Sequence, residues 1–321
     1  MKTPLTLPDN DIIHAVNNAF SLAIVHLEFI PAGEASWLYK ATAETGEQLV
    51  VKIQKSVAAA PSEVIAQLTE HHYQWIPESF LTAELLLWAN AHGYYFSVQR
   101  FVDSEQSYEA DSSPDNTYLE QVGRALAALH SQPFEPAKLP HVESEPFTLE
   151  GVATARQLLA DILSNTDDNE HIQRARRVLQ IHKASIEQLF VNLTTYTELL
   201  STLPRKLTIV HGDMHFGNIL APKNDHLYLV DWDNAKYSLP EKDIMFYSDD
   251  QIQAVSKGYG RNLLEDRVVV QYFRNYLVIR ALIFFLEKLT HGTVVDTSAA
   301  DKIVEIFDMG PFMRRALASE E

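Results

Sequence analysis

The sequence predicts an α+β fold of two lobes: a small β-rich N-lobe over residues 1–102 and a larger, mostly helical C-lobe over residues 103–321. Three short segments near the N-terminus are typical of successive strands: residues 25–30, 37–43 and 48–54. Beyond about residue 103, apolar side chains recur at helical spacing instead. A chain of 321 residues is long enough for two such lobes.

The remainder of the N-lobe is predicted to complete a sheet and to add one helix. Residues 44–47 form a hairpin turn between the last two of the three strands. A helical run from Pro61 to about His72 carries one apolar face. Residues 85–87 and 94–98 are predicted as two further strands, and the second of them leads toward the C-lobe.

The C-lobe is predicted to begin with a linker, because residues 104–115 are polar and rich in turn-forming residues. Residues 132–146 contain several prolines and predict a loop. Helical patterns cover the segments 117–130, 147–163, 171–203, 240–258, 264–290 and 299–318.

Composition narrows the class of function. The formal charge is −17 and no long cluster of Lys and Arg is present, which argues against nucleic-acid binding. An acidic surface attracts cationic small molecules, although the same charge also serves solubility. The chain contains no cysteine, so nothing indicates a disulfide framework. The composition leaves the oligomeric state open.

Two sequence features bear on localisation. The first ten residues lack the apolar segment of a secretory signal. The most apolar run, residues 276–286, is too short to span a bilayer and contains Arg280, so it predicts a buried core helix. We therefore expect a cytoplasmic protein with no membrane partner.

The segment between residues 210 and 233 carries the clearest chemical signal. Asn218 follows Asp213 by five residues, and a polar turn and an apolar run then lead to Asp231. Phosphoryl transfer of the kinase type needs one carboxylate that positions the attacking hydroxyl and accepts its proton. It also needs a carboxamide and a second carboxylate that hold Mg²⁺ on the phosphates. The spacing therefore predicts an ATP-dependent phosphotransferase with Asp213 as the catalytic base and Asn218 and Asp231 as metal ligands.

A zinc site is the alternative interpretation of His211, Asp213 and His215, because these residues alternate along an extended segment. Asn218 is a poor zinc ligand, and the hard oxygens of Asn218 and Asp231 suit Mg²⁺ better. We expect His211 and His215 to support the loop through hydrogen bonds.

The same segment predicts its own folding. Gly217 permits a tight turn, and residues 227–230 are expected to form a strand that brings Asp231 back beside Asn218. Trp232 is expected to pack in the core. Asp233 is expected to play a supporting role, either beside the metal ligands or as the N-cap of a helix.

The run His211-Gly212-Asp213, with His215, Asn218 and Leu220 at their spacing and Asp231-Trp232-Asp233 downstream, resembles the aminoglycoside phosphotransferase family. Members of this family are relatives of protein kinases that phosphorylate small molecules. Residues 240–246 and the helical pattern around residues 272–280 look most similar to its spectinomycin phosphotransferase branch. The resemblance implies a protein kinase-like bilobal fold, with ATP in the cleft and antibiotic resistance as the biological role.

The resemblance also implies nucleotide-binding residues in the N-lobe. Gly33 lies between the first two strands, where the kinase fold places its phosphate-covering loop, although the segment is not a G-x-G-x-x-G motif. Lys52 lies within an apolar strand and would bind the α- and β-phosphates; an edge-strand lysine facing solvent is the alternative. Glu63 is the expected ion-pair partner of Lys52, with Glu70 as its rival and a helix-dipole role as the alternative.

The connection between the lobes is expected at Gln99, Arg100 and Phe101, whose backbone groups would contact adenine. The expected reaction moves the γ-phosphate of ATP to a hydroxyl of a small, cationic acceptor, for which the resemblance implies an aminocyclitol such as spectinomycin. A metabolic kinase for homoserine, choline or a sugar is the alternative enzyme. A nucleotide-binding pseudokinase is the non-catalytic alternative.

Overall fold

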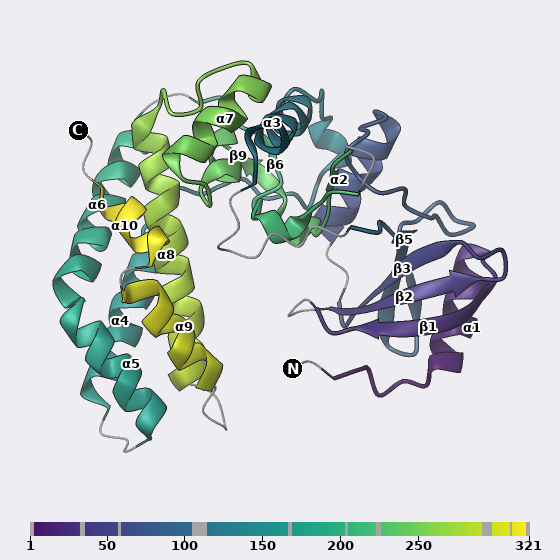
Figure 1. The fold of residues 1–321 in the computed structure, drawn as a ribbon, viewed down its shortest axis with the longest axis horizontal. Coiled ribbons are helices and arrows are strands. Elements are labelled where there is room, and N and C mark those ends of the chain that lie inside the picture. Colours follow the sequence, from purple (N-terminus) through teal and green to yellow (C-terminus); the bar gives the residue numbers. More distant parts are fainter. Residues whose placement is uncertain are drawn as a thin grey trace. The chain divides into compact units, whose positions relative to one another are not determined.

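A computed structural model describes residues 3–32, 36–56, 59–104, 114–165, 169–202, 205–222, 226–290, 297–308 and 310–318. The chain forms two compact units. The first comprises Met1–Glu143 and His211–Lys236, and the second comprises Ser144–Val210 and Tyr237–Glu321 (Figure 1). Residues 211–233, called the motif segment below, thus pack in the same unit as the N-terminal sheet. The predicted boundary between lobes after residue 102 stays a prediction.

The first unit is built on a five-stranded antiparallel sheet with the strand order β1-β2-β3-β5-β4. Its strands are β1 (Ile24–Ile30), β2 (Trp37–Ala43), β3 (Gln48–Gln54), β4 (Ala89–Ala91) and β5 (Tyr94–Arg100). The three predicted N-terminal strands are therefore confirmed, as is the hairpin turn between β2 and β3, where Gly46 has φ +85°.

One face of this sheet packs against helix α1 (Asp9–Phe20), which the sequence analysis did not predict. Strand residues alternate between the two faces of a sheet. The buried set therefore includes every second residue of β3 and β5, packed against apolar residues of α1: Ile12, Val16, Phe20, Leu49, Val51, Ile53, Phe96 and Val98. The intervening residues, among them Lys52, lie on the opposite face.

The register places Lys52 in the middle of that opposite face. Lys52 pairs with Leu38 on β2 and with Ser97 on β5, so β3 is an interior strand. The alternative of an edge-strand lysine is therefore wrong.

Helix α2 (Ala59–Glu70) and helix α3 (Asn116–His130) belong to the same unit, with a 3₁₀ turn at Pro136–Lys138. Both helices confirm predicted segments. The strand predicted at residues 85–87 is wrong, because Leu85 has φ +62° and its amide donates to the carbonyl of Thr82 at 2.9 Å. This local turn replaces ladder pairing, and the strand begins at Ala89 instead. The linker predicted at residues 104–115 lies mostly outside the described residues.

The motif segment folds as a series of short elements. They are the 3₁₀ turn η2 (Phe216–Asn218), strands β7 (Ile219–Leu220) and β8 (Tyr228–Leu229), and the 3₁₀ turn η3 (Trp232–Asn234). β7 and β8 pair antiparallel, which confirms the predicted hairpin return. Strand β6 (Thr208–Val210), before the segment, pairs with β9 (Lys236–Ser238) after it.

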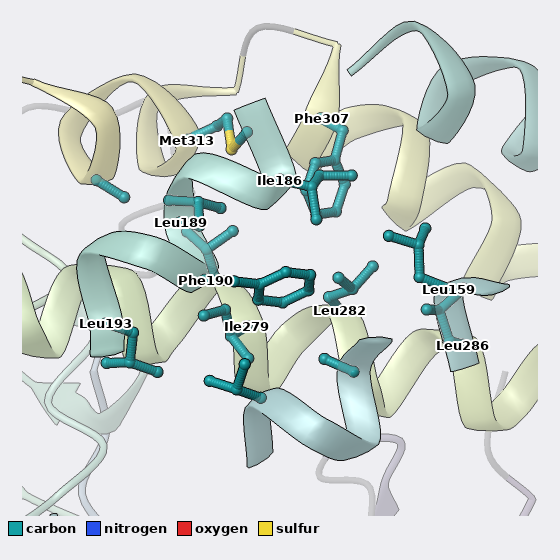
Figure 2. Close-up of a cluster of buried hydrophobic side chains, with 14 of the residues drawn as sticks. Leu159, Ile186, Leu189, Phe190, Leu193, Ile279, Leu282, Leu286, Phe307 and Met313 are labelled. Carbon is teal, nitrogen blue, oxygen red and sulfur yellow. The ribbon is translucent and has the colours of Figure 1, made fainter. Parts of the chain in front are cut away.

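The second unit is helical. It contains α4 (Glu150–Ser164), α5 (Glu170–Ile181), α6 (Lys183–Ser201), α7 (Asp249–Tyr259), α8 (Arg267–Thr290), α9 (Thr297–Phe307), α10 (Pro311–Leu317) and a 3₁₀ turn η4 (Pro240–Ile244). Its core lies between α4, α6, α8 and α9. Figure 2 shows Phe190 of α6 beside Ile279 and Leu282 of α8.

Three predicted helical segments are divided in the structure. Residues 240–258 form η4 and α7, and residues 245–248 between them are not helical. Residues 171–203 form α5 and α6, because the chain breaks at His182. Residues 299–318 form α9 and α10, and Pro311 occupies the first turn of α10, where its missing N–H is tolerated.

Helix α8 is long and apolar enough to cross a bilayer by length and composition alone. In this structure it is a core helix. Its buried side chains include Val278, Ile279, Leu282 and Leu286, which agrees with the prediction for residues 276–286.

Candidate functional site

The loop after β6 is fixed at its first residue. His211 is fully buried, and its Nε2–H donates to the carbonyl of Val230 at 2.9 Å. Its ring packs on Trp232 with centroids 4.6 Å apart. His211 therefore joins the start of the loop to the residue before Asp231, as expected of a supporting residue.

Gly212 occupies a position that other residues fit poorly. Its φ is +81°, and a Cβ atom there would lie 2.3 Å from the carbonyl oxygen of Asn234. The tight turn was predicted at Gly217, but the positive φ belongs to Gly212. Gly217 lies within η2, and its amide donates to Nδ1 of His215 at 3.0 Å. His215 thus caps that short turn.

Asp213 and Asn218 are joined directly. The Nδ2–H of Asn218 donates to the backbone carbonyl of Asp213 at 2.8 Å, and Asn218 is buried. A carbonyl can only accept, so the amide nitrogen must face Asp213, which leaves the Asn218 Oδ1 turned elsewhere. Asn234 donates weakly to the Asp213 carboxylate at 3.4 Å. The Asp213 backbone thus orients the Asn218 side chain, and the Asn234 side chain contacts the Asp213 carboxylate.

Asp231 adopts a left-handed conformation with φ +64°, which is uncommon outside glycine. The amide of Val230 donates to the carbonyl of Asn218 at 3.0 Å, so the predicted return of Asp231 to Asn218 is confirmed. Trp232 is buried and donates from Nε1 to the carbonyl of Leu229 at 3.1 Å. Its expected packing role is confirmed, and it anchors the turn that carries Asp231 and Asp233.

Lys52 joins the sheet to this turn. Its Nζ lies 3.0 Å from Oδ1 of Asp231 and 2.9 Å from each carboxylate oxygen of Asp233. Burial by itself lowers the pKa of Lys52, but the charges of Asp231 and Asp233 outweigh it and raise the pKa above the ordinary value. Lys52 is therefore positively charged, and the two carboxylates hold its ammonium group in place. Asp233 is a partner of Lys52, and η3 gives it no helix N-cap role.

The expected ion pair between Lys52 and Glu63 is wrong. The Glu63 carboxylate instead accepts from the backbone N–H of His141 at 3.1 Å and contacts its ring Nδ1 at 2.5 Å. Its rival Glu70 pairs with Lys138 at 2.9 Å. The physical reason is that both carboxylates of α2 have partners in the segment after α3, whereas the η3 turn supplies two carboxylates to Lys52.

A pocket within the first unit opens on the Lys52 face of the sheet. Its walls come from β3, β5, α2, the turn at η3 and the loop before β4. The residues that line it include Lys52, Gln54, Ile65, Trp88, Ser97, Gln99, Asp231 and Asp233. The Gln99 side chain donates to Oγ of Ser79 at 3.0 Å along this wall. Gln54, Ser97 and Trp88 are not among the residues predicted from the sequence. The alternation of β3 indicates Gln54, because it lies two residues after Lys52 and therefore on the same face.

Arg100 is the last residue of β5 and Phe101 follows it; both are predicted to offer backbone groups to adenine. The amide of Arg100 donates to the Glu78 carbonyl, and the amide of Phe101 donates to the Gln48 carbonyl. Both N–H groups are therefore used within the protein, and contact of adenine with the other backbone groups of residues 99–101 stays a prediction. Gly33 lies outside the described residues.

Metal-binding potential rests on oxygen atoms. Within the described ranges, no group of three or more His, Asp or Glu side chains is arranged to hold a metal ion. Nδ1 of His215 accepts from Gly217, as described above, so that nitrogen is engaged in the loop. The candidate cation ligands are the Asn218 carboxamide and the Asp231 carboxylate.

Five carboxylates follow shortly after Asp231 in the sequence and are candidates to pair with a cationic acceptor: Asp233, Glu241, Asp243, Asp249 and Asp250. Three of the five are held in ion pairs: Asp233 with Lys52, Glu241 with Arg261 at 2.8 Å, and Asp249 with Arg274 at 2.6 Å. Asp243 is fully buried. Three of these carboxylates are thus paired within the protein and the fourth is buried. Asp250 is exposed.

The fold and the lysine–carboxylate site together define a kinase-like phosphotransferase architecture. A profile of the phosphotransferase enzyme family matches residues 26–280. The chain belongs to this family. No curated protein matches the sequence.

Solved structures with the same fold cover almost the whole chain. A spectinomycin phosphotransferase in complex with ADP and spectinomycin has a TM-score of 0.85 at 16% identity, covering 98% of this chain and 99% of that one. An aminoglycoside phosphotransferase from Alicyclobacillus acidocaldarius has a TM-score of 0.64 at 12% identity, covering 98% and 95%. An ethanolamine kinase from Plasmodium vivax has a TM-score of 0.59 at 11% identity, covering 97% and 86%. These likenesses confirm the predicted kinase-like fold.

Proposed function

We propose that the protein is an ATP-dependent O-phosphotransferase that moves the γ-phosphate to a hydroxyl group of a small acceptor. The observation that carries this proposal is the meeting of Lys52 from β3 with Asp231 from the motif turn, 179 residues apart in sequence. A phosphate-binding cation and a metal-binding carboxylate on one wall are what phosphoryl transfer requires.

Each of the loop residues has a distinct role in this reaction. Asp213 orients the acceptor hydroxyl and takes its proton. Lys52 binds the nucleotide phosphates. The oxygens of Asn218 and Asp231 fit Mg²⁺, because the Asn218 nitrogen is already bonded to Asp213 and the Asp231 side chain is 48% exposed. Bound Mg²⁺ supplies charge neutralisation on the phosphates.

The proposed acceptor is a cationic aminocyclitol such as spectinomycin, and the proposed biological role is antibiotic resistance in the cytoplasm. The acidic charge of −17 and the TM-score of 0.85 to a spectinomycin phosphotransferase support this choice. The likeness to an ethanolamine kinase keeps a metabolic amino-alcohol kinase as the second candidate. A screen of aminocyclitols, amino alcohols and sugars with ATP and Mg²⁺ separates the two.

Replacement of Asp213 tests the assignment of the base. Asp213→Ala is expected to lower phosphate transfer by about 10²–10⁴-fold, the range typical of general acid–base catalysis. Binding of ATP with Mg²⁺, measured by calorimetry, is expected to stay within about twofold, because Asp213 serves the acceptor and not the nucleotide.

Asn218→Ala and Asp231→Ala are the comparison variants. Both are expected to weaken nucleotide binding in the presence of Mg²⁺ and to have little effect in its absence. If Asp213→Ala turns over at the wild-type rate, Asp213 is not the catalytic base. Stabilisation of the wild-type fold by ATP and Mg²⁺, without transfer to any acceptor of the panel, would favour the pseudokinase.

A further inference from the structure

The position of Asp233 is fixed from both sides. Trp232 buries its ring beside Tyr73 and His211 and so holds the η3 turn in place. From the sheet, both Lys52 and Gln54 reach the Asp233 carboxylate, the first at 2.9 Å and the second at 3.3 Å. Gln54 lies two residues after Lys52 on β3 and therefore on the same face. Asp233 is thus held by two neighbouring side chains of one strand.

The contact of Lys52 with Asp231 differs from its contact with Asp233. Lys52 meets one oxygen of Asp231 but both oxygens of Asp233. Asp231 is assigned above to Mg²⁺, which would compete with Lys52 for that carboxylate. The bidentate contact with Asp233 involves no atom assigned to the metal, so it can persist while nucleotide is bound.

Helix α2 offers no substitute. Glu63 is held through two contacts to His141, and its side chain is 19% exposed. Glu70 is held by Lys138. Release of either carboxylate would break an existing ion pair or hydrogen bond.

We infer that Asp233 is the positioning residue for Lys52, and that it orients the lysine ammonium toward the nucleotide phosphates in place of a carboxylate from helix α2. This inference deepens the proposed function and rests on it. Asp233 acts through Lys52 and does not itself contact the transferred group. The role of α2 is then to close the wall of the pocket through Pro61, Ser62 and Ile65.

Binding of ADP in the presence of EDTA tests the inference without any acceptor or metal. The affinity is measured by calorimetry for wild type, Lys52→Met, Asp233→Asn and the double variant. Asp233→Asn is expected to weaken binding by about 10-fold, the loss typical of one charge-assisted hydrogen bond. The double variant is expected to bind no more weakly than Lys52→Met, because Asp233 acts through the lysine.

Two carboxylates of α2 provide the matched controls. The changes in ADP affinity caused by Glu63→Gln and Lys52→Met are expected to add in the double variant. Glu70→Gln is expected to leave ADP affinity unchanged. Asp233→Glu, which keeps the charge, is expected to recover part of the affinity. Thermal unfolding of each variant separates a loss of binding from a loss of folding; if Asp233→Asn does not fold, Asp233→Glu is combined with Lys52→Met in the same cycle.

Three results would overturn the inference or its basis. Additive effects of Lys52→Met and Asp233→Asn would show that Asp233 does not act through Lys52. Weaker binding by Asp233→Asn only when Mg²⁺ is present would make Asp233 a metal ligand. A wild-type protein that binds ADP neither with nor without Mg²⁺ would remove the proposed function itself, which is a distinct outcome.

Discussion

At the scale of single residues, the loop that carries Asp213 depends on the absence of a side chain at Gly212. We predict that Gly212→Ala lowers the free energy of unfolding by about 2–5 kcal/mol, since it combines a left-handed backbone with a clash against Asn234. Gly93→Ala is the matched control: its φ is +76°, but a Cβ atom there meets nothing within 4 Å. This control is expected to cost only about 1–2 kcal/mol.

Urea unfolding followed by circular dichroism measures both variants. Equal losses for Gly212→Ala and Gly93→Ala would show that the loop moves away from Asn234 at no cost. Activity provides a second measurement, because a displaced loop also moves Asp213. Gly212→Ala is therefore expected to lose phosphate transfer, while Gly93→Ala keeps it.

Individual site residues differ in how far the sequence can predict them. Asn218 and the residue before Asp231 could be placed together, because a short hairpin with clear turn and strand signals connects them. The partner of Lys52 could not be predicted in this way. The choice between Glu63 and Asp233 depends on where His141 lies, and that loop is distant in sequence from both β3 and α2.

At the scale of elements, helix α7 is joined to helix α8 through Asp249. This residue follows the N-cap Ser248 and pairs with Arg274 at 2.6 Å and Arg267 at 3.0 Å. Burial raises the pKa of the Asp249 carboxyl, but the two guanidinium groups outweigh burial and lower it below its ordinary value of 3.8. A depressed pKa means that the folded state favours the charged carboxylate.

We predict that Asp249→Asn destabilises the second unit at neutral pH and that the difference from wild type shrinks at acid pH. The lowered pKa stabilises the fold above the ordinary value of 3.8, and this contribution is lost as the pH falls below that value. Thermal unfolding at a series of pH values from about 7 down to about 2 measures the difference. Asp250→Asn, in the same helical turn but exposed, is the control. A constant difference between Asp249→Asn and wild type at all pH values would contradict the prediction.

Element boundaries were predictable where one pattern dominated the segment. β1, β2 and β3 and the amphipathic helix α3 follow from local patterns of side chains. The strand predicted for the leucine run at residues 85–87 is wrong, because an apolar composition is also compatible with a turn that exposes Leu85. The break at His182 carries no Gly or Pro signal, so a continuous helical pattern concealed two helices.

At the scale of the whole molecule, ion pairing within the protein cannot remove the negative charge. The chain has 43 acidic and 26 Lys or Arg side chains, so 17 carboxylates remain even if every basic residue is paired. Pairing does change where that charge acts, since Asp233, Glu241 and Asp249 are each held in an ion pair with a cation of the protein. Attraction of a cationic acceptor therefore depends on the net field and not on these particular carboxylates.

The net negative charge of the protein predicts that the KM of a cationic acceptor depends on salt. With ATP and Mg²⁺ saturating, the KM of a cationic aminocyclitol is expected to rise with ionic strength, because the screening length falls from about 30 Å at 0.01 M to about 8 Å at 0.15 M salt. A neutral sugar assayed in parallel is the control, and its KM is expected to stay constant. If the neutral sugar is phosphorylated as efficiently as any amine, with no salt effect on either, the aminocyclitol assignment fails. A small-molecule kinase with a different acceptor would then remain.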